Sequence, residues 1–465
     1  MKINIQKTLL ILTCLMLLGV LLVNDFKHAL EFDSSFNLNV VKNIVTHGIY
    51  GTSVYLVDGQ KYYWFDPWIT TGPTVFLPTA LLIKFIDNFV LVPRLVMNGF
   101  FFLFIFAIAK LIQKSQKRIT FAWVSMLVIS ATIIFSKFIN NATVLGVDFV
   151  GEVPAYLFTI GSIGGLALGS PMIAGLMIGL AVLTKLQLIY LCLPLSLGYL
   201  CYFYKKNIKS AVRFTFFGAL PLLVYLATLL AVYGRNIKAY YGDFKGVAIM
   251  QKAYPTMVGG ITSMGERFIR FLQYDPSFLL LSTVGLIIIL LRWKKYDLKH
   301  KIIFASFSIY LGYFLFIWQF IAPRHLIIPK LLLFLFQCSV TLEYLSTRNI
   351  KKIITIIALI SLLLFPSLIE SGDALRNQIE AANHIRNEYG NATIYNVGWW
   401  KSPELQILLN KDFVRLDKKN REFCKQNCLL IIADTVLKND LTIVPIASKY
   451  RMVDSFNGYN LYDLD

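Results

Sequence analysis

Carboxylates stand beside long apolar runs of this sequence, where a charged side chain is costly. Asp33 follows the first apolar run, residues 8–23, and Asp148 and Glu152 come directly before residues 153–184, which carry no charge. Ionisable residues at such places are candidates for function, and a carboxylate there could act as a general base on an acceptor hydroxyl or amine. Each acid also has a plainer interpretation: Asp33 and Glu152 as N-caps of the helices that follow them, and Asp148 as a loop residue.

Basic side chains end two other apolar runs. Lys185 closes GLAVLTK, Arg324-His325 follow an apolar run in IAPRHLIIP, and His47 lies in THGIYG, after Asp33. Lys and Arg can hold and neutralise a phosphate leaving group. Together with the carboxylates they indicate a lipid phosphate whose head group reaches the membrane surface. In the plainer interpretation Lys185 extends to the interface, Arg324 contacts lipid head groups and the histidines are structural.

The composition requires helices that cross a membrane. Hydrophobic residues make up 57% of the 465-residue chain, and charged residues make up 15%. A span needs ~20 apolar residues to cross the hydrocarbon core, and several runs approach this length. Residues 1–23 resemble a secretory signal, but no small-residue cleavage site follows them, so we expect an uncleaved first helix.

The positive charge is distributed as in a polytopic membrane protein. The net charge is +19, yet residues 370–465 are close to neutral, so the excess lies in short clusters between apolar runs. Cytoplasmic loops retain Lys and Arg in this way, and we therefore expect no nucleic-acid partner. The clusters expected inside are Lys2 with Lys7, Lys110–Arg118, Lys205–Arg213, Arg292–Lys301 and Arg348–Lys352.

The basic clusters predict the topology, because clusters on one side are separated by an even number of crossings. Residues 73–91 are the weakest candidate span, since Lys84 and Asp87 interrupt them and Pro73 and Pro78 break them. We expect a juxtamembrane helix on the outer side, with a true span as the alternative. About eleven spans remain, with the N-terminus inside and the C-terminus outside. They are residues 8–23, 94–112, 119–137, 153–169, 171–185, 186–204, 211–233, 277–292, 302–321, 326–346 and 353–369.

The chain divides into two predicted domains. Residues 1–369 form the membrane domain, with large extracytoplasmic loops at residues 25–93 and 234–276. Residues 370–465 change to a mixed pattern, with helices at 373–389 and in PELQILLN and strands at 392–400 and 428–434. We therefore expect an all-α polytopic membrane protein with a small extracytoplasmic α/β domain, in which Cys424 and Cys428 could form a disulfide.

Five stretches resemble, in order, the motifs of GT-C membrane glycosyltransferases. This class includes the protein O-mannosyltransferases, which use dolichyl-phosphate-mannose, and the lipid A aminoarabinose transferases. FDSSFNLNVVKNIVTHGIYGT is similar to their first-loop motif, and ITTGPTVFLPTALLIKF to their Pro-rich juxtamembrane helix. GEVPAYLFTIGS resembles their second acidic motif, GLAVLTK their helix ending in Lys, and APRHLIIP their Arg-containing segment. The resemblance covers residues 8–350.

The resemblance implies roles for single residues. Asp33 matches the catalytic acid, and Glu152 or Asp148 matches the second acid. Lys185 and Arg324 match positions that handle the carrier phosphate. His47 and His325 are further candidate substrate-binding residues in the same motifs.

Two departures from the motifs bear on these roles. Ser34 follows Asp33, where many relatives have Glu, and this change affects metal use or acceptor choice. The Lys that often precedes the paired prolines is absent from TTGPT, which removes one phosphate contact. A divalent ion, Mg²⁺ or Mn²⁺, held by Asp33 and Glu152 is a candidate cofactor.

The resemblance implies an integral glycosyltransferase of the cytoplasmic membrane. It would move a sugar from a polyprenyl-phosphate carrier to an extracytoplasmic glycan, lipid or protein, with Asp33 as general base. The alternative is a transporter or flippase of lipid-linked saccharides. A transporter should have paired broken helices near the bilayer midplane, whereas the ionisable residues here gather at one predicted face, which favours the enzyme.

Overall fold

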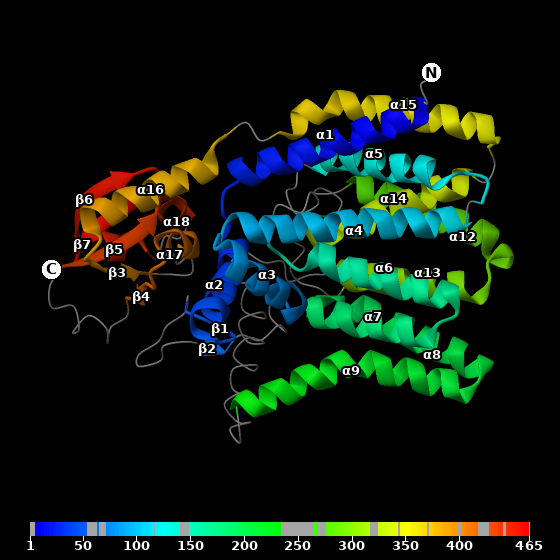
Figure 1. The fold of residues 1–465 in the computed structure, drawn as a ribbon, viewed down its shortest axis with the longest axis horizontal. Coiled ribbons are helices and arrows are strands. Elements are labelled where there is room, and N and C mark those ends of the chain that lie inside the picture. Colours follow the sequence, from blue (N-terminus) through cyan, green and yellow to red (C-terminus); the bar gives the residue numbers. More distant parts are fainter. Residues whose placement is uncertain are drawn as a thin grey trace.

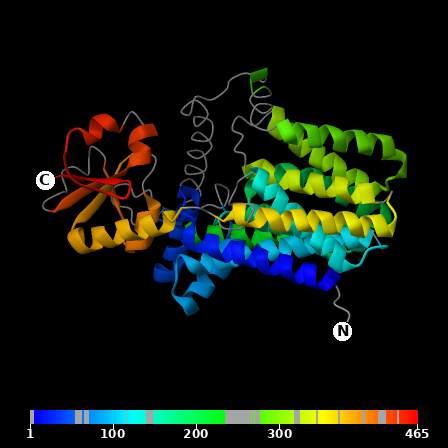
Figure 2. The same ribbon diagram turned by 90° about the horizontal axis from the view of Figure 1, so that it is seen from above.

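A bundle of apolar helices forms most of the molecule, and a small α/β domain lies at one end of it (Figures 1 and 2). The computed structural model describes residues 5–53, 63–64, 71–115, 117–139, 148–233, 265–266, 269, 276–316, 324–342, 345–369, 372–397, 402–416, 427–439 and 443–464. Most of the second predicted outer loop, residues 234–276, lies outside these ranges.

The bundle helices follow the predicted apolar runs. Their axes lie side by side across Figure 1. Each run predicted as a span is occupied by one helix, with bounds that differ by a few residues. The helices are α1 (Ile5–Lys27), α4 (Leu91–Ser115), α5 (Phe121–Ile139), α6 (Glu152–Leu168), α7 (Pro171–Thr184), α8 (Ile189–Lys206), α9 (Ile208–Tyr233), α12 (Pro276–Arg292), α13 (Leu298–Phe316), α14 (Arg324–Leu342) and α15 (Thr347–Leu364). Short 3-10 turns η1 (Leu186–Leu188), η2 (Trp293–Lys295) and η3 (Phe365–Leu368) adjoin them.

Within the described residues, five helices are long and apolar enough to cross a membrane: Lys7–Lys27, Leu91–Lys114, Leu186–Lys206, Ile208–Thr228 and Thr347–Leu368. Others, such as α6 and α7, are equally apolar but shorter. Large apolar side chains also stand on the outside of the bundle, and Leu291 and Leu363 are each 81% exposed. Such a surface requires a lipid environment. The fold is therefore that of a polytopic membrane protein, while the number of spans stays a prediction.

The hairpin between α6 and α7 shows how the sequence sets a helix boundary. Gly169 ends α6 with φ +71°, in the left-handed region that favours glycine. Ser170 then caps α7, because its hydroxyl accepts a hydrogen bond from the Ile173 N–H, and Pro171 occupies the first turn, where no N–H is needed.

Two helices leave the bundle pattern at the end that faces the α/β domain. α2 (Phe32–His47) and α3 (Pro73–Ile86) lie there together with strands β1 (Gly51–Thr52) and β2 (Tyr63–Trp64) (Figure 1). α3 has 14 residues, which span ~21 Å against a hydrocarbon core of ~30 Å. α7, which occupies a predicted span, has the same length, so helix length does not separate the two alternatives and the juxtamembrane position of α3 stays a prediction.

Among its described residues, the C-terminal domain holds one five-stranded sheet in the order β4-β3-β5-β7-β6. β3 runs parallel to β4 and β5, whereas β7 is antiparallel to β5 and β6. Separate hydrophobic clusters cover its two faces, which confirms the predicted small α/β domain. Its elements are α16 (Ala374–Tyr389), β3 (Thr393–Asn396), α17 (Pro403–Leu409), β4 (Val414–Arg415), β5 (Cys428–Ala433), α18 (Asp434–Asn439), α19 (Val444–Ala447), β6 (Arg451–Phe456) and β7 (Tyr459–Asp463).

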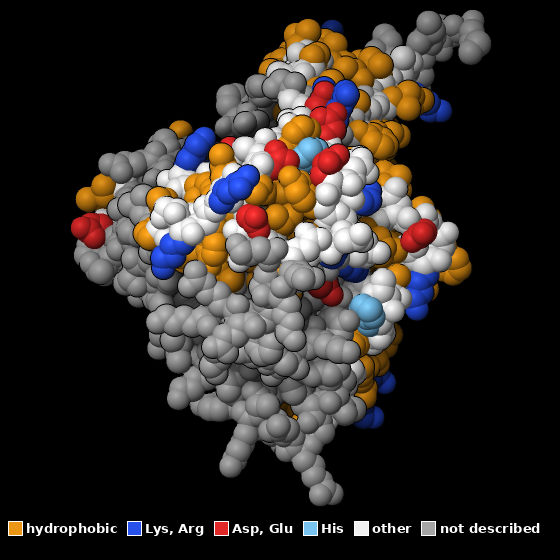
Figure 3. Space-filling model, turned by 90° about the vertical axis from the view of Figure 1, so that its left-hand side faces the viewer, with side chains coloured by type: hydrophobic (Ala, Val, Ile, Leu, Met, Phe, Trp, Pro, Cys, Tyr) orange, Lys and Arg blue, Asp and Glu red, His pale blue; other side chains and the backbone are white. Residues whose placement is uncertain are grey.

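Figure 3 looks at the end of the molecule that this domain occupies. Acidic, basic and hydrophobic side chains are interspersed over the coloured part of this face. Cys428, at the start of β5, is disulfide-bonded. Cys424, the partner expected from the sequence, lies outside the described residues.

Candidate active site

The helix that carries Asp33 is polar and mostly buried. α2 begins at Phe32 with Glu31 at the N-cap position, so Asp33 lies inside the first turn, and its interpretation as an N-cap is wrong. Its side chain is half-buried. A carboxylate in the first turn of a helix is stabilised by the helix dipole. Asp33 therefore stands at a structured position, in the first turn of a mostly buried helix.

The loop that contains the second pair of acids is hydrogen-bonded to α2. The Phe149 N–H donates to Ser34 Oγ at 3.0 Å. Asn37 Nδ2 donates to the Phe149 carbonyl at 2.8 Å and to Thr71 Oγ1 at 3.2 Å. Ser34, the departure from the motif that follows Asp33, thus fixes the acidic loop to the helix of the proposed base.

Glu152 and Lys185 form an ion pair. Lys185 Nζ lies 3.1 Å from Glu152 Oε1, and the side chains are 8% and 2% exposed. Glu152 is the first residue of α6, whose N-cap is Gly151, so the N-cap interpretation of Glu152 is also wrong. The Lys185 side chain is buried against Glu152, which favours a role in the site over the plainer interpretation in which it extends to the membrane interface. The second acidic motif and the helix ending in Lys therefore meet in space.

Gly72 precedes Pro73, at the place where the motif often has Lys, and it packs closely against the end of α7. Its N–H donates to the Thr184 carbonyl at 2.8 Å, and Thr74 Oγ1 lies 2.6 Å from Thr184 Oγ1. A Cβ on Gly72 would lie 1.7 Å from the Leu183 carbonyl oxygen. No side chain fits there, because the start of α3 packs directly on the end of α7.

Asp148 has different partners from Glu152. Its Oδ1 lies 3.1 Å from Nε2 of His28, which in turn lies 3.8 Å from Glu31 Oε1. Among the described residues, these three form the group that could hold a metal ion. Asp33 and Glu152, the metal ligands expected from the sequence, are not in it. The sequence motifs give no role to His28 or Glu31, which precede Asp33 in the chain.

Three predicted site residues lie elsewhere or cannot be placed. His47 is exposed at the far end of α2, ~21 Å along the helix from Asp33, so the structure does not bring the two together. α14 begins at Arg324, but the side chains of Arg324 and His325 lie outside the part of the chain that the structure describes.

The C-terminal domain contacts the other side of the segment around α2. Gln378 of α16 pairs with both backbone groups of Leu30: its Oε1 accepts from the N–H at 2.8 Å, and its Nε2 donates to the carbonyl at 3.1 Å. Asp412 accepts hydrogen bonds from Ser53 Oγ at 2.7 Å and from Lys42 Nζ at 3.5 Å. Burial lowers the pKa of Lys42, while Asp412 opposes that shift. These contacts join residues more than 300 positions apart, and no local pattern predicts them.

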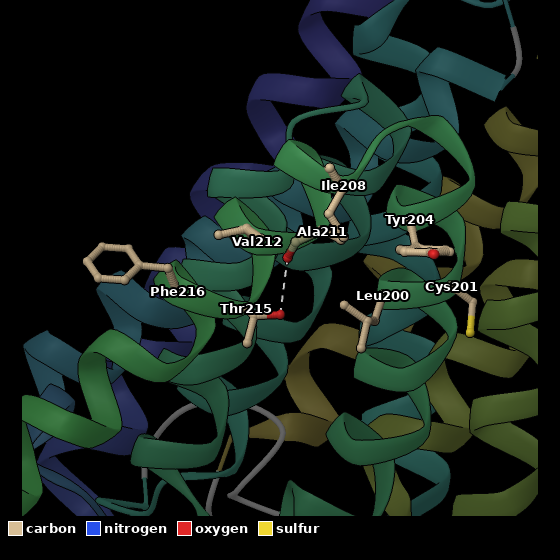
Figure 4. A pocket seen from close by; sticks show the side chains of 8 residues that line it. All are labelled: Leu200, Cys201, Tyr204, Ile208, Ala211, Val212, Thr215 and Phe216. Carbon is tan, nitrogen blue, oxygen red and sulfur yellow. Dashed lines mark hydrogen bonds between the residues drawn. The ribbon is translucent and has the colours of Figure 1, made fainter.

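An apolar groove lies on the bundle between α8 and α9 (Figure 4). It has a volume of about 570 Å³ and is lined by Leu200, Tyr204, Val212 and Phe216 among others. The Thr215 hydroxyl in its wall donates to the Ala211 carbonyl at 3.1 Å. The groove therefore has an apolar lining suited to contact with lipid chains, and it contains none of the charged side chains of the site around α2.

Two solved structures share this architecture. Crystal structures of ArnT from Cupriavidus metallidurans, bound to undecaprenyl phosphate and in the apo state, superpose with TM-scores of 0.63 and 0.62. They are 13% and 12% identical to this chain, cover 98% of it, and are covered over 98% and 97% of their own lengths. No protein-family model and no curated protein matches the sequence. The chain therefore shares its fold with ArnT over nearly its whole length.

Proposed function

We propose that this protein is an integral membrane glycosyltransferase. It transfers a sugar from a polyprenyl-phosphate carrier to an acceptor on the extracytoplasmic side of the membrane. The likeness of fold to ArnT, which binds undecaprenyl phosphate in one of its structures, supports this class of donor. The disulfide at Cys428 supports an oxidising compartment for the C-terminal domain.

The observation that carries the proposal is the convergence of three motifs at one end of the bundle. α2, which bears Asp33, is hydrogen-bonded to Phe149 in the loop that ends at Glu152. Glu152 in turn pairs with Lys185 at the end of α7. An acid suited to be a base and a cation suited to bind phosphate therefore belong to one connected site.

The chemistry assigned to this site is a displacement at the anomeric carbon of the donor. Asp33 takes the proton of the acceptor hydroxyl or amine, the new glycosidic bond forms, and the bond from the anomeric carbon to the phosphate oxygen breaks. The polyprenyl phosphate leaves with the bonding electrons. Lys185 and Arg324 stabilise its negative charge, as basic side chains do at transferred phosphoryl groups.

Glu152 is proposed to hold Lys185 in place. A buried lysine with its own carboxylate is oriented by that partner. A donor phosphate at the site would draw on the same ammonium group, which has three donors. Glu152 would then set the position of the cation, while Asp33 carries the proton transfer.

The test is the release of undecaprenyl phosphate from undecaprenyl-phosphate-linked sugars by purified protein in proteoliposomes. The enzyme should release it when acceptor-containing membrane extract is supplied, and Asp33→Asn should lower the rate by ~10²–10⁴-fold while the protein still inserts and binds the lipid. A transporter or flippase would move the intact lipid across the bilayer and release no phosphate carrier. That result, or wild-type rates in Asp33→Asn, would overturn the proposal.

A further inference from the structure

We propose that His28, Glu31 and Asp148 bind a divalent transition-metal ion. The three candidate ligand atoms all lie within 4.8 Å of one another. His28 Nε2 is 3.1 Å from Asp148 Oδ1 and 3.8 Å from Glu31 Oε1. Ligand atoms that share one ion at ~2.0–2.2 Å in tetrahedral geometry lie ~3.4 Å apart. The observed separations fit this value with only small movements of the side chains.

The segment that supplies two of the ligands is held rigidly. It runs from His28 to Glu31 between α1 and α2. The His28 N–H donates to the Asn24 carbonyl at 2.8 Å, and Arg94 Nη2 donates to the His28 carbonyl at 2.6 Å. Gln378 binds both backbone groups of Leu30, midway between the ligands. Ligands on a backbone fixed in this way are preorganised, which favours metal affinity.

The third ligand is tied to the same place from a distant part of the chain. The residue after Asp148 is Phe149, whose N–H and carbonyl are bound by Ser34 Oγ and Asn37 Nδ2 at 3.0 and 2.8 Å. Both partners belong to α2, the helix that Glu31 precedes. The backbone that carries all three ligands is therefore hydrogen-bonded around the start of α2, and binding of an ion requires no loop rearrangement.

Exposure differs across the group in a way that suits ion entry. The Asp148 and His28 side chains are 11% and 13% exposed, whereas Glu31 is 59% exposed. Three protein ligands with one open side leave a coordination position for water or for an oxygen of a substrate. One imidazole with two carboxylates favours Zn²⁺ or Mn²⁺ over Mg²⁺, which keeps to oxygen ligands.

The test measures Zn²⁺ binding to the full-length protein in detergent by equilibrium dialysis and metal analysis, without any donor lipid. The wild type should bind one more Zn²⁺ than His28→Ala or Asp148→Asn. Each variant should lose more affinity than the ~10–100-fold that removal of a group supporting a ligand costs. His47→Ala, which removes an exposed histidine of α2 outside the group, is the matched control and should bind as the wild type does.

The Asp148→Asn variant keeps the shape of the side chain, so it separates loss of a ligand from loss of the fold, and circular dichroism should show unchanged helix content. Equal Zn²⁺ in the wild type and both variants would mean that His28 and Asp148 share a hydrogen bond only, and the proposal would be wrong. Asp33→Asn should bind Zn²⁺ normally. Failure of the metal site is thus distinguishable from failure of the proposed transfer reaction.

Discussion

Lys185 Nζ lies 3.1 Å from Glu152 Oε1, and both side chains are almost fully buried. The pair joins the end of α7 to the first residue of α6, the two helices that Gly169 and Ser170 connect at their opposite ends. A buried pair contributes little net stability, but removing one partner leaves a charge in an apolar environment. Stability and donor binding therefore respond differently to substitutions here.

We expect Lys185→Met to lower the free energy of unfolding by ~3–5 kcal/mol, because it leaves Glu152 buried without its cation. The double variant Glu152→Gln/Lys185→Met removes both charges and should recover most of this loss. Binding of undecaprenyl phosphate should stay weak in both, since neither has the cation. Denaturant unfolding in detergent and a lipid-binding titration check this. Normal lipid binding by the stable double variant would show that Lys185 has no role in donor recognition.

Gly72 gives a steric prediction. Its missing Cβ would meet the Leu183 carbonyl oxygen at 1.7 Å, so Gly72→Ala must push α3 from the end of α7 and should cost ~1–3 kcal/mol of unfolding free energy. The control is Gly99→Ala in α4, where no atom lies within 4 Å of the added carbon. Thermal unfolding of the two variants in one detergent makes the comparison. An equal effect of both would mean that α3 and α7 do not approach this closely.

Gln378→Ala tests the hydrogen bonds between the C-terminal domain and the segment before α2. Two hydrogen bonds of ~0.5–1.5 kcal/mol each are lost, and amide exchange in residues 28–33 should accelerate. Arg376→Ala, which removes an exposed residue paired with Glu380 on the same helix, serves as control and should leave this exchange unchanged. Exchange measured by mass spectrometry that is equally fast in both variants would contradict the contact.

Glu404 predicts a pH dependence of the C-terminal domain. Burial raises the pKa of this carboxyl to about 7, although Tyr459 Oη donates to it at 3.0 Å. Between its unfolded pKa, ~4.3, and about 7 the folded state binds more protons than the unfolded state. Stability should therefore fall as the pH rises through this window, by on the order of 3 kcal/mol in total. Glu404→Gln should flatten this part of the curve of unfolding free energy against pH, and an unchanged slope in the variant would refute the assignment.

The predicted orientation can be tested by labelling in intact cells. The background is Cys201→Ser, which removes an exposed native thiol. Cysteines are introduced one at a time at Asn207 and at Ser448, both of which are solvent-exposed. A reagent that cannot cross the membrane should label the second and not the first. Labelling of both from outside would exclude a C-terminus on the opposite side from the α8–α9 turn.

The membrane helices were predictable because their signals are local. Apolar length marks the spans, and Gly169-Ser170-Pro171 marks a turn whose cap geometry the structure reproduces. One local signal was overlooked. Asn457-Gly458, between two alternating runs, is typical of a hairpin, and both residues have positive φ where β6 turns into β7.

The site could be predicted only in part, for a physical reason. The order of the motifs predicts Glu152 and Lys185 as separate site residues, but the ion pair between them depends on how α6 and α7 pack. The contact between His28 and Asp148 needs the loop at Phe149 to bind Ser34, and that between Gln378 and Leu30 needs a separate domain to dock. Such tertiary choices leave no period or spacing in the sequence.

The contacts of Gln378 and Asp412 also set an order of events in biogenesis. α2 leaves the ribosome early, soon after the first helix, whereas the two residues that bond to it and to its flanking segments are translated only after the entire bundle. During most of synthesis, α2 therefore lacks the contacts with Gln378 and Asp412. Completion of the site coincides with the folding of the sheet, so a truncated chain would insert in the membrane with this helix unsecured.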